Sequence, residues 1–280
     1  MPAKIIDGRK LSEKIINGLK SRIKNSKEKP GLALVLVGNN PASEIYVNFK
    51  EKTCREAGFY CERFNLDEGI SAMNLLKLVN ELNQKKSIHG ILVQLPLPDG
   101  INEHLIINSI LPHKDVDGFT PVNLGSLVSG NPIIAPATAR AVMHLIESTG
   151  MSIRGKDAVV IGRSRIVGKP VAMMLLKKNA TVTICHSKTK NLAEYTKKAD
   201  IIVAAAGKPN LITKEMIKYG SVIIDVGINR MGGKVVGDVD FENAKEIAGY
   251  ITPVPGGVGP MTIALLMDNT LKAMELSKVL

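Results

Sequence analysis

The chain has 280 residues, of which 45% are hydrophobic and 22% charged, and its net charge is +11. This composition is typical of a globular protein of one or two domains and excludes a disordered chain. Apolar runs stay far below the ~20 residues that cross a bilayer, and charges interrupt the apolar residues at the start, unlike in a signal peptide. We therefore expect a cytoplasmic protein that does not bind membranes.

The cysteines and the positive charge bear on possible ligands. Cys54, Cys61 and Cys185 share no C-x-x-C spacing, which argues against a zinc site or a disulfide framework, so we expect three reduced thiols and no metal. The excess of Lys and Arg suggests an anionic partner such as nucleic acid or a phosphorylated small molecule. These side chains are scattered and form no basic tail, so a solvated surface is the simpler interpretation.

Helices and strands alternate in the first half of the chain. Apolar residues recur at helical spacing between Gly8 and Pro30, and the apolar run from Leu32 to Val37 predicts a buried strand. The same criteria predict a helix over 42–57, an extended stretch over 59–66, a helix over 71–84 and a strand over 88–95. Such alternation indicates right-handed crossovers and a parallel sheet.

The second half predicts a doubly wound α/β domain. Its short apolar strands lie at 158–161, 181–184, 201–204 and 222–225. A polar, Pro-rich stretch over 112–136 leads out of the first domain, and a helix over 138–149 bridges into the second. We expect domains over 1–137 and 138–262, with a helix over 263–280 packing back on the first domain.

The segment after the strand at 158–161 has features of a dinucleotide site. Gly162 and Gly168 bracket a short turn that precedes an apolar helix. A dinucleotide needs a tight turn, close approach of the backbone to the pyrophosphate and a helix N-terminus aimed at it. Because the spacing is not G-x-G-x-x-G, a plain strand-turn-helix connection explains this segment about as well.

The residues after the strand at 181–184 favour NADP over NAD. An NAD site usually has Asp or Glu there, whereas this chain has Cys185-His-Ser-Lys-Thr-Lys190. Hydroxyls and cations suit a 2′-phosphate, and Arg163 can add a charge-assisted fork. Each of Lys188 and Lys190, taken alone, can also be a solvated side chain.

Four polar residues in the first half are candidates for catalysis. Tyr46 and Lys50 lie at positions i and i+4 of a predicted helix and so share one face. Gln94 lies at the carboxyl end of a predicted parallel strand, where ligands of α/β sheets bind, and Asp117 lies in a loop farther along. Spacing alone leaves ordinary surface or core roles open for each of them.

Five segments resemble the signature blocks of the FolD family of bifunctional methylenetetrahydrofolate dehydrogenases and methenyltetrahydrofolate cyclohydrolases. They occur in the family's order and span nearly the whole chain. The segments are Val37 to Lys50, Val93 to Pro98, Lys114 to Gly118, Gly162 to Ser164 with Val167 to Pro170, and Pro253 to Thr262.

The resemblance implies two α/β domains with a cleft between them, the C-terminal one a Rossmann-type parallel sheet, in a homodimer joined through the NADP domains. Such an enzyme oxidises 5,10-methylenetetrahydrofolate to 5,10-methenyltetrahydrofolate with NADP and hydrolyses the product to 10-formyltetrahydrofolate. This reaction sequence belongs to one-carbon metabolism and purine biosynthesis. Its ligands are small molecules, and nucleic acid is not expected.

The resemblance also implies a role for each matching residue. Lys50 is the key catalytic group and Gln94 tunes it, while Tyr46 lies against the p-aminobenzoate ring and Asp117 hydrogen-bonds the pterin. The other implied substrate-binding residues are Val93, Leu95, Pro255, Gly256, Gly257, Val258 and Gly259. The implied NADP-binding residues are Gly162, Arg163, Ser164, Val167, Gly168, Ser187 and Ile228.

Two alternatives to the bifunctional enzyme are a dehydrogenase that has lost cyclohydrolase activity and a basic nucleic-acid-binding or nucleotide-sensing protein without turnover. Lys50 with Gln94 disfavours the first, and Tyr46 with Asp117 has no purpose in the second. One departure from the family is visible, because Pro136-Ala-Thr-Ala139 replaces its common Pro-Cys-Thr-Pro. We expect Thr138 to cap the following helix.

Overall fold

The computed structural model describes residues 2–279, which form two compact α/β units. The three-stranded unit comprises residues 13–137 and those from Ile263 on. The six-stranded unit comprises the residues up to Ser12 and Thr138–Thr262. Both sheets are parallel, which confirms the predicted α/β class with a Rossmann-type sheet in the C-terminal half.

The sheet of the three-stranded unit has the order β3-β2-β4, with β2 (Gly31–Val37) between β3 (Tyr60–Leu66) and β4 (Gly90–Val93). Every residue of β2 is buried, as expected for a central parallel strand covered on both faces. Because side chains alternate along a strand, Leu32, Leu34 and Leu36 belong to one core cluster, and Ala33, Val35 and Val37 to another.

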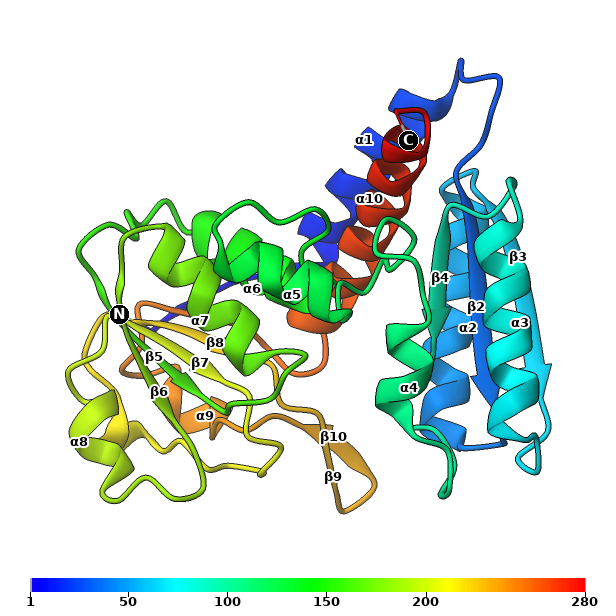
Figure 1. Ribbon diagram of the computed structural model, residues 1–280. Helices are drawn as coiled ribbons and strands as arrows, with labels where there is room; N and C mark the ends of the chain where they lie inside the picture. The colour runs from blue at the N-terminus through cyan, green and yellow to red at the C-terminus, as the bar shows by residue number, and fades with distance from the viewer. Residues whose placement is uncertain (1, 280) are drawn as a thin grey trace. The chain divides into compact units, whose positions relative to one another are not determined.

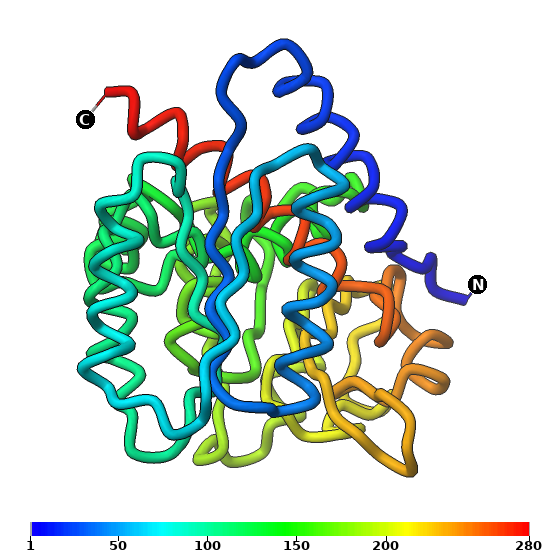
Figure 2. Tube along the Cα trace, turned by 90° about the vertical axis from the view of Figure 1, so that its right-hand side faces the viewer, coloured from blue at the N-terminus to red at the C-terminus, as the bar shows by residue number. Residues whose placement is uncertain are grey.

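Helices cover both faces of this sheet, and Figure 2 shows two of them, α2 and α3, on opposite sides of its strands. The covering helices are α1 (Gly8–Ile23), α2 (Pro41–Glu56), α3 (Ala72–Gln84), α4 (Glu103–Asn108) and α10 (Val258–Ser277). The unit also contains α5 (Pro121–Val128). α1 and α10 lie side by side (Figure 1), and Arg22 of α1 forms ion pairs with Asp268 and Glu275 of α10.

The sheet of the six-stranded unit has the order β1-β11-β8-β7-β5-β6. Its strands are β1 (Lys4–Ile5), β5 (Asp157–Ile161), β6 (Thr181–Cys185), β7 (Ile201–Ala204), β8 (Val222–Asp225) and β11 (Tyr250–Ile251). The helices are α6 (Ala137–Glu147), α7 (Gly168–Lys177), α8 (Leu192–Thr196), α9 (Phe241–Ala244) and the 3₁₀ turn Lys214–Met216. An antiparallel hairpin joins β9 (Asn229–Met231) to β10 (Lys234–Val236).

Several elements differ from the prediction. The Pro-rich stretch contains α5, whose N-cap is Thr120 and whose first residue is Pro121. The last helix, α10, starts at Val258, earlier than predicted, because Pro260 is tolerated in its first turn. Thr138 is not a helix cap, since α6 already begins at Ala137. The strands β1 and β11 were not predicted, because each is too short to show an alternation of apolar and polar residues.

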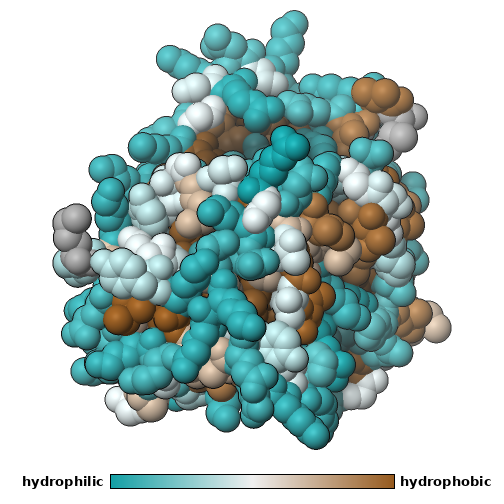
Figure 3. Space-filling model, turned by 90° about the vertical axis from the view of Figure 1, so that its left-hand side faces the viewer, coloured by the Kyte–Doolittle hydropathy of each residue, from teal (hydrophilic) through white to brown (hydrophobic). Residues whose placement is uncertain are grey.

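The start of the chain differs from the domain limits expected above. β1 pairs in parallel with β11, where Lys4 lies opposite Tyr250 and Ile5 opposite Ile251, so the first residues belong to the six-stranded unit. The closing residues, from Ile263 on, belong to the three-stranded unit. No helix within residues 2–279 is long and apolar enough to cross a membrane. The face in Figure 3 is mainly hydrophilic, with apolar residues in separate patches.

Candidate functional site

Lys50 and Gln94 meet in the three-stranded unit, where the Lys50 amine donates a hydrogen bond of 3.0 Å to Gln94 Oε1. α2 carries Lys50, and its start is fixed by Asn40, whose side chain accepts hydrogen bonds from the Ala42 and Ser43 amides. The helix therefore begins directly beyond the carboxyl end of β2. Lys50 lies on its half-buried side, in its third turn.

Gln94 follows β4 and is fixed at both backbone and side chain. Its amide donates to Val35 O over 2.8 Å, and its Nε2 donates to Leu95 O over 2.7 Å, so Oε1 faces Lys50. The peptide bond between Leu95 and Pro96 is cis. A pocket of about 300 Å³ lies at this end of the sheet, lined by 37–40, Glu68 and 96–98.

Asp117 lies in a loop that packs beside β4. Ile91 N donates to Lys114 O over 2.8 Å, which sets the loop against the strand. The buried Asp115 carboxylate then accepts hydrogen bonds from Gly118 N (3.0 Å), Thr120 N (2.7 Å) and Asn123 Nδ2 (2.9 Å). These hydrogen bonds fix the conformation of the loop, and Asp117 lies at its turn.

Asn269 of α10 also holds this loop in place. This side chain is 1% exposed, and its Nδ2 donates to Val116 O (2.8 Å) and to Ala135 O (2.9 Å). Sequence reasoning missed both Asp115 and Asn269 as supports of Asp117. Asp115 carried a weak signal, since it lies two residues from Asp117, whereas Asn269 is a polar residue in an apolar helix with no motif around it.

Burial and charge shift the titration of the two ionisable groups in this site. Burial lowers the pKa of the Lys50 amine below 10.5, and the negative charge of Asp117 opposes that shift. Burial raises the pKa of Asp117 to about 6, against the effect of Lys50, while Asp115 adds to the rise. A lysine with a lowered pKa and an aspartate with a pKa raised toward neutral pH are typical of a site that transfers protons.

The other predicted substrate residues fall into both units. Tyr46 is half-buried one turn before Lys50, Val93 is buried at the end of β4, and Leu95 is half-buried beside Gln94. Pro255 to Gly259 belong to the six-stranded unit and form the turn into α10 and its start. Gly257 has no room for a side chain there, because a Cβ would lie 2.7 Å from Pro253 O.

The turn between β5 and α7 has the close approach that a dinucleotide requires. Gly162 has φ +127°, and a Cβ on it would lie 2.1 Å from Ala205 O. A Cβ on Gly168 would lie 2.1 Å from Gly162 O. Ser164 Oγ accepts hydrogen bonds from the Val167 and Gly168 amides at the start of α7. Both glycines are therefore needed for the turn, whose Arg163 side chain is exposed.

The turn after β6 suits a phosphate. His186 Nδ1 accepts a hydrogen bond from Lys188 N, and Thr189 Oγ1 accepts one from His186 N, which leaves Ser187 exposed. No Asp or Glu occurs between Cys185 and Lys190. Ile228, after β8, is 52% exposed. The tight glycine turn and these polar and basic groups fit NADP, whose nicotinamide accepts a hydride when bound.

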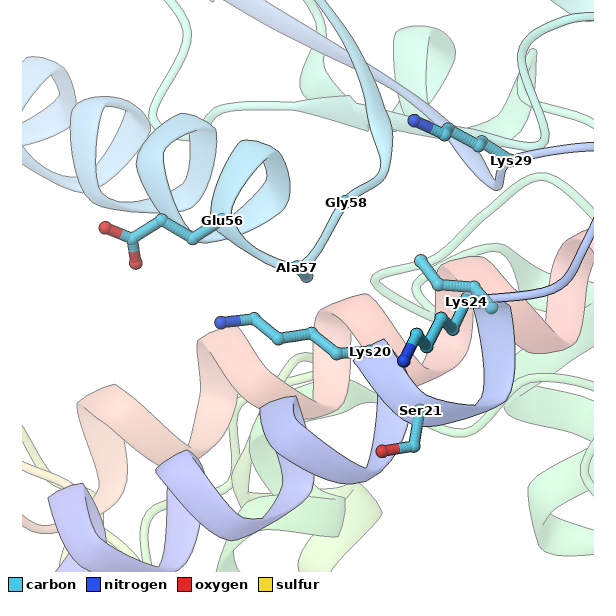
Figure 4. A pocket seen from close by; sticks show the side chains of 8 residues that line it. Lys20, Ser21, Lys24, Lys29, Glu56, Ala57 and Gly58 are labelled. Atoms are coloured by element: carbon cyan, nitrogen blue, oxygen red, sulfur yellow. The ribbon is translucent and has the colours of Figure 1, made fainter.

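A second pocket of the three-stranded unit, of about 330 Å³, has a different lining. Figure 4 shows Lys20, Lys24 and Lys29 around it, next to Ala57 and Gly58 at the end of α2. Lys50, Gln94 and Asp117 do not line it. This pocket therefore carries none of the candidate chemistry.

Comparison with known proteins identifies the chain's relatives. Residues 6–117 match the family model for the tetrahydrofolate dehydrogenase/cyclohydrolase catalytic domain, and residues 136–278 match that for its NAD(P)-binding domain. The bifunctional protein FolD of Moorella thermoacetica is 56% identical over 277 residues, covering 98% of this chain and 99% of its own. The chain belongs to the tetrahydrofolate dehydrogenase/cyclohydrolase family.

Solved structures agree with this assignment. The bifunctional FolD of Campylobacter jejuni has a TM-score of 0.95 and 49% identity, covering 98% of this chain and 99% of its own. The FolD of Trypanosoma brucei, in a complex with NADP cofactor and inhibitor, has a TM-score of 0.95 and 39% identity, with 99% of each chain covered. The predicted family and a cofactor of the NAD(P) class are thus confirmed.

Proposed function

We propose that Lys50, Gln94, Asp117 and Tyr46 carry the folate chemistry of this chain, and that the turns at Gly162 and Ser187 hold NADP. The enzyme oxidises 5,10-methylenetetrahydrofolate to 5,10-methenyltetrahydrofolate with NADP and hydrolyses that product to 10-formyltetrahydrofolate. The observation that carries the proposal is the hydrogen bond between the half-buried Lys50 amine and Gln94. It places a titratable group with a lowered pKa beside a neutral partner.

The oxidation requires positioning more than proton transfer. The hydride leaves the methylene carbon of the substrate with its electron pair, and the lone pair of a ring nitrogen forms the methenyl cation. In our proposal Tyr46 packs against the p-aminobenzoate ring and Asp117 hydrogen-bonds the pterin, which orients that carbon. Well-oriented reactants gain much of their rate enhancement from this arrangement alone.

The hydrolysis requires a proton carrier. Water adds to the methenyl carbon and loses both of its protons as its oxygen becomes the formyl oxygen. One carbon–nitrogen bond breaks and the departing nitrogen takes up one proton, so one proton is released overall. Lys50 can accept the first proton as a neutral amine and return it to the nitrogen. Gln94 orients the amine without adding a charge that would hold it protonated.

The remaining assignments concern binding, assembly and location. Val93, Leu95 and Pro255 to Gly259 complete the proposed substrate contacts, and Arg163, Ser164, Val167, Gly168 and Ile228 complete those to NADP. We also propose a homodimer formed through the six-stranded units, which is supported by the exposed apolar Met231 and Val235 of the β9–β10 hairpin. We also propose a cytoplasmic location.

One assay of the unmodified protein tests the function. Methylenetetrahydrofolate and NADP are mixed with the protein, and the absorbance of NADPH and that of methenyltetrahydrofolate are followed together. The proposal predicts NADPH formation without lasting accumulation of the methenyl compound. If the methenyl compound accumulates and decays no faster than it does without the protein, the protein is a dehydrogenase alone. Absence of NADPH would contradict both activities.

A further inference from the structure

Two buried carboxylates of the six-stranded unit have no part in the chemistry proposed above. Asp225 ends β8 and is 3% exposed, while Asp238 precedes α9 and is 0% exposed. Asp238 accepts hydrogen bonds from the backbone amides of Ala206 (2.6 Å), Gly207 (2.9 Å) and Lys208 (2.9 Å), and from Asn229 Nδ2 (2.9 Å). These four bonds use all of the ~4 lone-pair sites that an ionised carboxylate offers.

Asp225 in turn fixes the segment that carries Asp238. Its carboxylate accepts hydrogen bonds of 2.9 Å from the amides of Gly227, Asp238 and Val239. Gly227 and Gly237 leave no space around the two carboxylates. A Cβ on Gly227 would lie 2.2 Å from Asp238 Oδ1, and a Cβ on Gly237 would lie 1.9 Å from Asp225 Oδ2.

The loop held by Asp238 borders the proposed cofactor site. Residues 205–208 follow β7 at the carboxyl edge of the sheet, and Ala205 O lies against the Cα of Gly162, where a Cβ would be 2.1 Å away. β5 lies between β6 and β7, so the chain changes direction across the sheet at this point. Ligands of doubly wound sheets bind at the carboxyl edge where that change occurs.

The three amides bound by Asp238 are successive in the chain, an arrangement that elsewhere binds the oxygens of a phosphate. In this protein a side chain of the same unit occupies them. The loop is therefore ordered by an internal anion and does not require a phosphate of the cofactor to order it. A binding site that is ordered in advance avoids the entropy cost of ordering it on binding.

We propose that Asp238 is a positioning residue for NADP, whose carboxylate preorders the loop 205–208 beside the Gly162 turn, with Asp225 fixing Asp238 in place. This inference rests on the proposed placement of NADP at the Gly162 turn. In addition to the Gly162 turn, NADP binding then requires the neighbouring loop 205–208 to be ordered before the cofactor binds.

Asp238→Asn is the direct test, with Asp240→Asn as the matched control. Asp240 lies two residues farther along, and its carboxylate accepts a hydrogen bond from Asn243, with no bond to the loop 205–208. Loss of a hydrogen bond to a charged group corresponds to about a 10- to 100-fold change in an equilibrium constant. We expect the Kd for NADPH and the KM for NADP to rise by that factor in Asp238→Asn, while kcat at saturating NADP and methenyl hydrolysis stay within about twofold.

Hydrogen exchange provides a second measurement, which does not depend on enzyme activity. In the unmodified protein without NADP, the amides of 206–208 should be as protected as those of β7. In Asp238→Asn they should exchange rapidly, and saturating NADP should restore part of their protection. A purely structural role would instead reduce methenyl hydrolysis and NADP binding together.

The outcomes separate two failures. If the unmodified protein binds no NADPH, the proposed cofactor site is wrong, and the role of Asp238 is overturned with it. If it binds NADPH and Asp238→Asn binds equally well, or if the loop amides are unprotected without NADP, the role of Asp238 alone is overturned.

Discussion

The Lys50 amine donates its hydrogen bond to the Gln94 carboxamide over 3.0 Å, so its hydrogen-bond acceptor is neutral. A carboxylate at this position would hold the amine as an ammonium ion, which cannot accept a proton from water. The choice of glutamine is therefore part of the proposed mechanism, together with the burial that lowers the pKa of Lys50.

Gln94→Glu should suppress hydrolysis more strongly than oxidation. The new carboxylate raises the pKa of Lys50, so the neutral amine is scarcer at pH 7, and the rise of hydrolysis with pH should move to higher pH. Rates of methenyl decay and NADPH formation between pH 6 and about 9 measure this. Gln84→Glu, at the exposed end of α3, is the control. An unchanged pH profile in Gln94→Glu would remove Gln94 from this role.

Asp117 should make the protein less stable as it ionises. Its pKa is 3.8 in an unfolded chain and about 6 in the fold, so between these values the folded state binds more protons. The free energy of unfolding therefore falls as pH rises through this window. Asp117→Asn should flatten this dependence and stabilise the protein at pH 7, by at most about 3 kcal/mol. Urea unfolding at pH 4.5 and pH 7 checks it.

Asp115→Asn is the contrasting change in the same loop. An amide in place of the carboxylate leaves a donor among Gly118, Thr120 and Asn123 without its acceptor, so unfolding should become easier by about 1–3 kcal/mol. We therefore expect Asp117→Asn to raise the free energy of unfolding and Asp115→Asn to lower it. Such opposite changes would distinguish a buried carboxylate that destabilises the fold from one whose hydrogen bonds stabilise it. Equal effects of both substitutions would contradict this distinction.

Arg163→Ala should narrow the preference for NADP over NAD. A charge-assisted hydrogen bond to the 2′-phosphate is worth ~1.5–3 kcal/mol, about a 10- to 100-fold change in affinity. The ratio of kcat/KM for the two cofactors measures it, with Arg154→Ala, another exposed arginine of the six-stranded unit, as control. Equal use of NAD and NADP by the unmodified protein would contradict the proposed phosphate site.

Gly168→Ala should abolish NADP binding, because its Cβ would lie 2.1 Å from Gly162 O and force the turn open. Gly18→Ala in α1 meets no atom within 4 Å and should be neutral or slightly stabilising, since Ala is the better helix former. Titration with NADPH by fluorescence and thermal unfolding compare the two variants. Tight NADPH binding by Gly168→Ala would show that this glycine is not required.

The sequence predicted the parts of the molecule that depend on local pattern. The central strand β2 has a continuous apolar run, and Tyr46 and Lys50 share a helical face, so both could be placed from spacing. The family resemblance supplied the roles proposed for Gln94 and Asp117. Spacing alone had left these roles open.

The missed features depend on contacts between distant residues. Asn269 supports the Asp117 loop from 153 residues away in the chain, and Asp238 holds amides 30 to 32 residues away. β1 and β11 are strands only because they pair with each other and with β8. No periodicity or spacing rule reports such pairings before the chain is folded.

Lys50→Met tests the central claim most directly, because it keeps the apolar stem of the side chain and removes the amine. Loss of a general acid or base typically costs ~10²- to 10⁴-fold, so methenyl hydrolysis should fall by that factor. NADPH formation should fall less, since the proposed substrate contacts of Tyr46 and Asp117 are retained. Lys52→Met, whose side chain is 70% exposed on the same helix, should retain both activities. Methenyl hydrolysis by Lys50→Met at the rate of the unmodified protein would contradict the account.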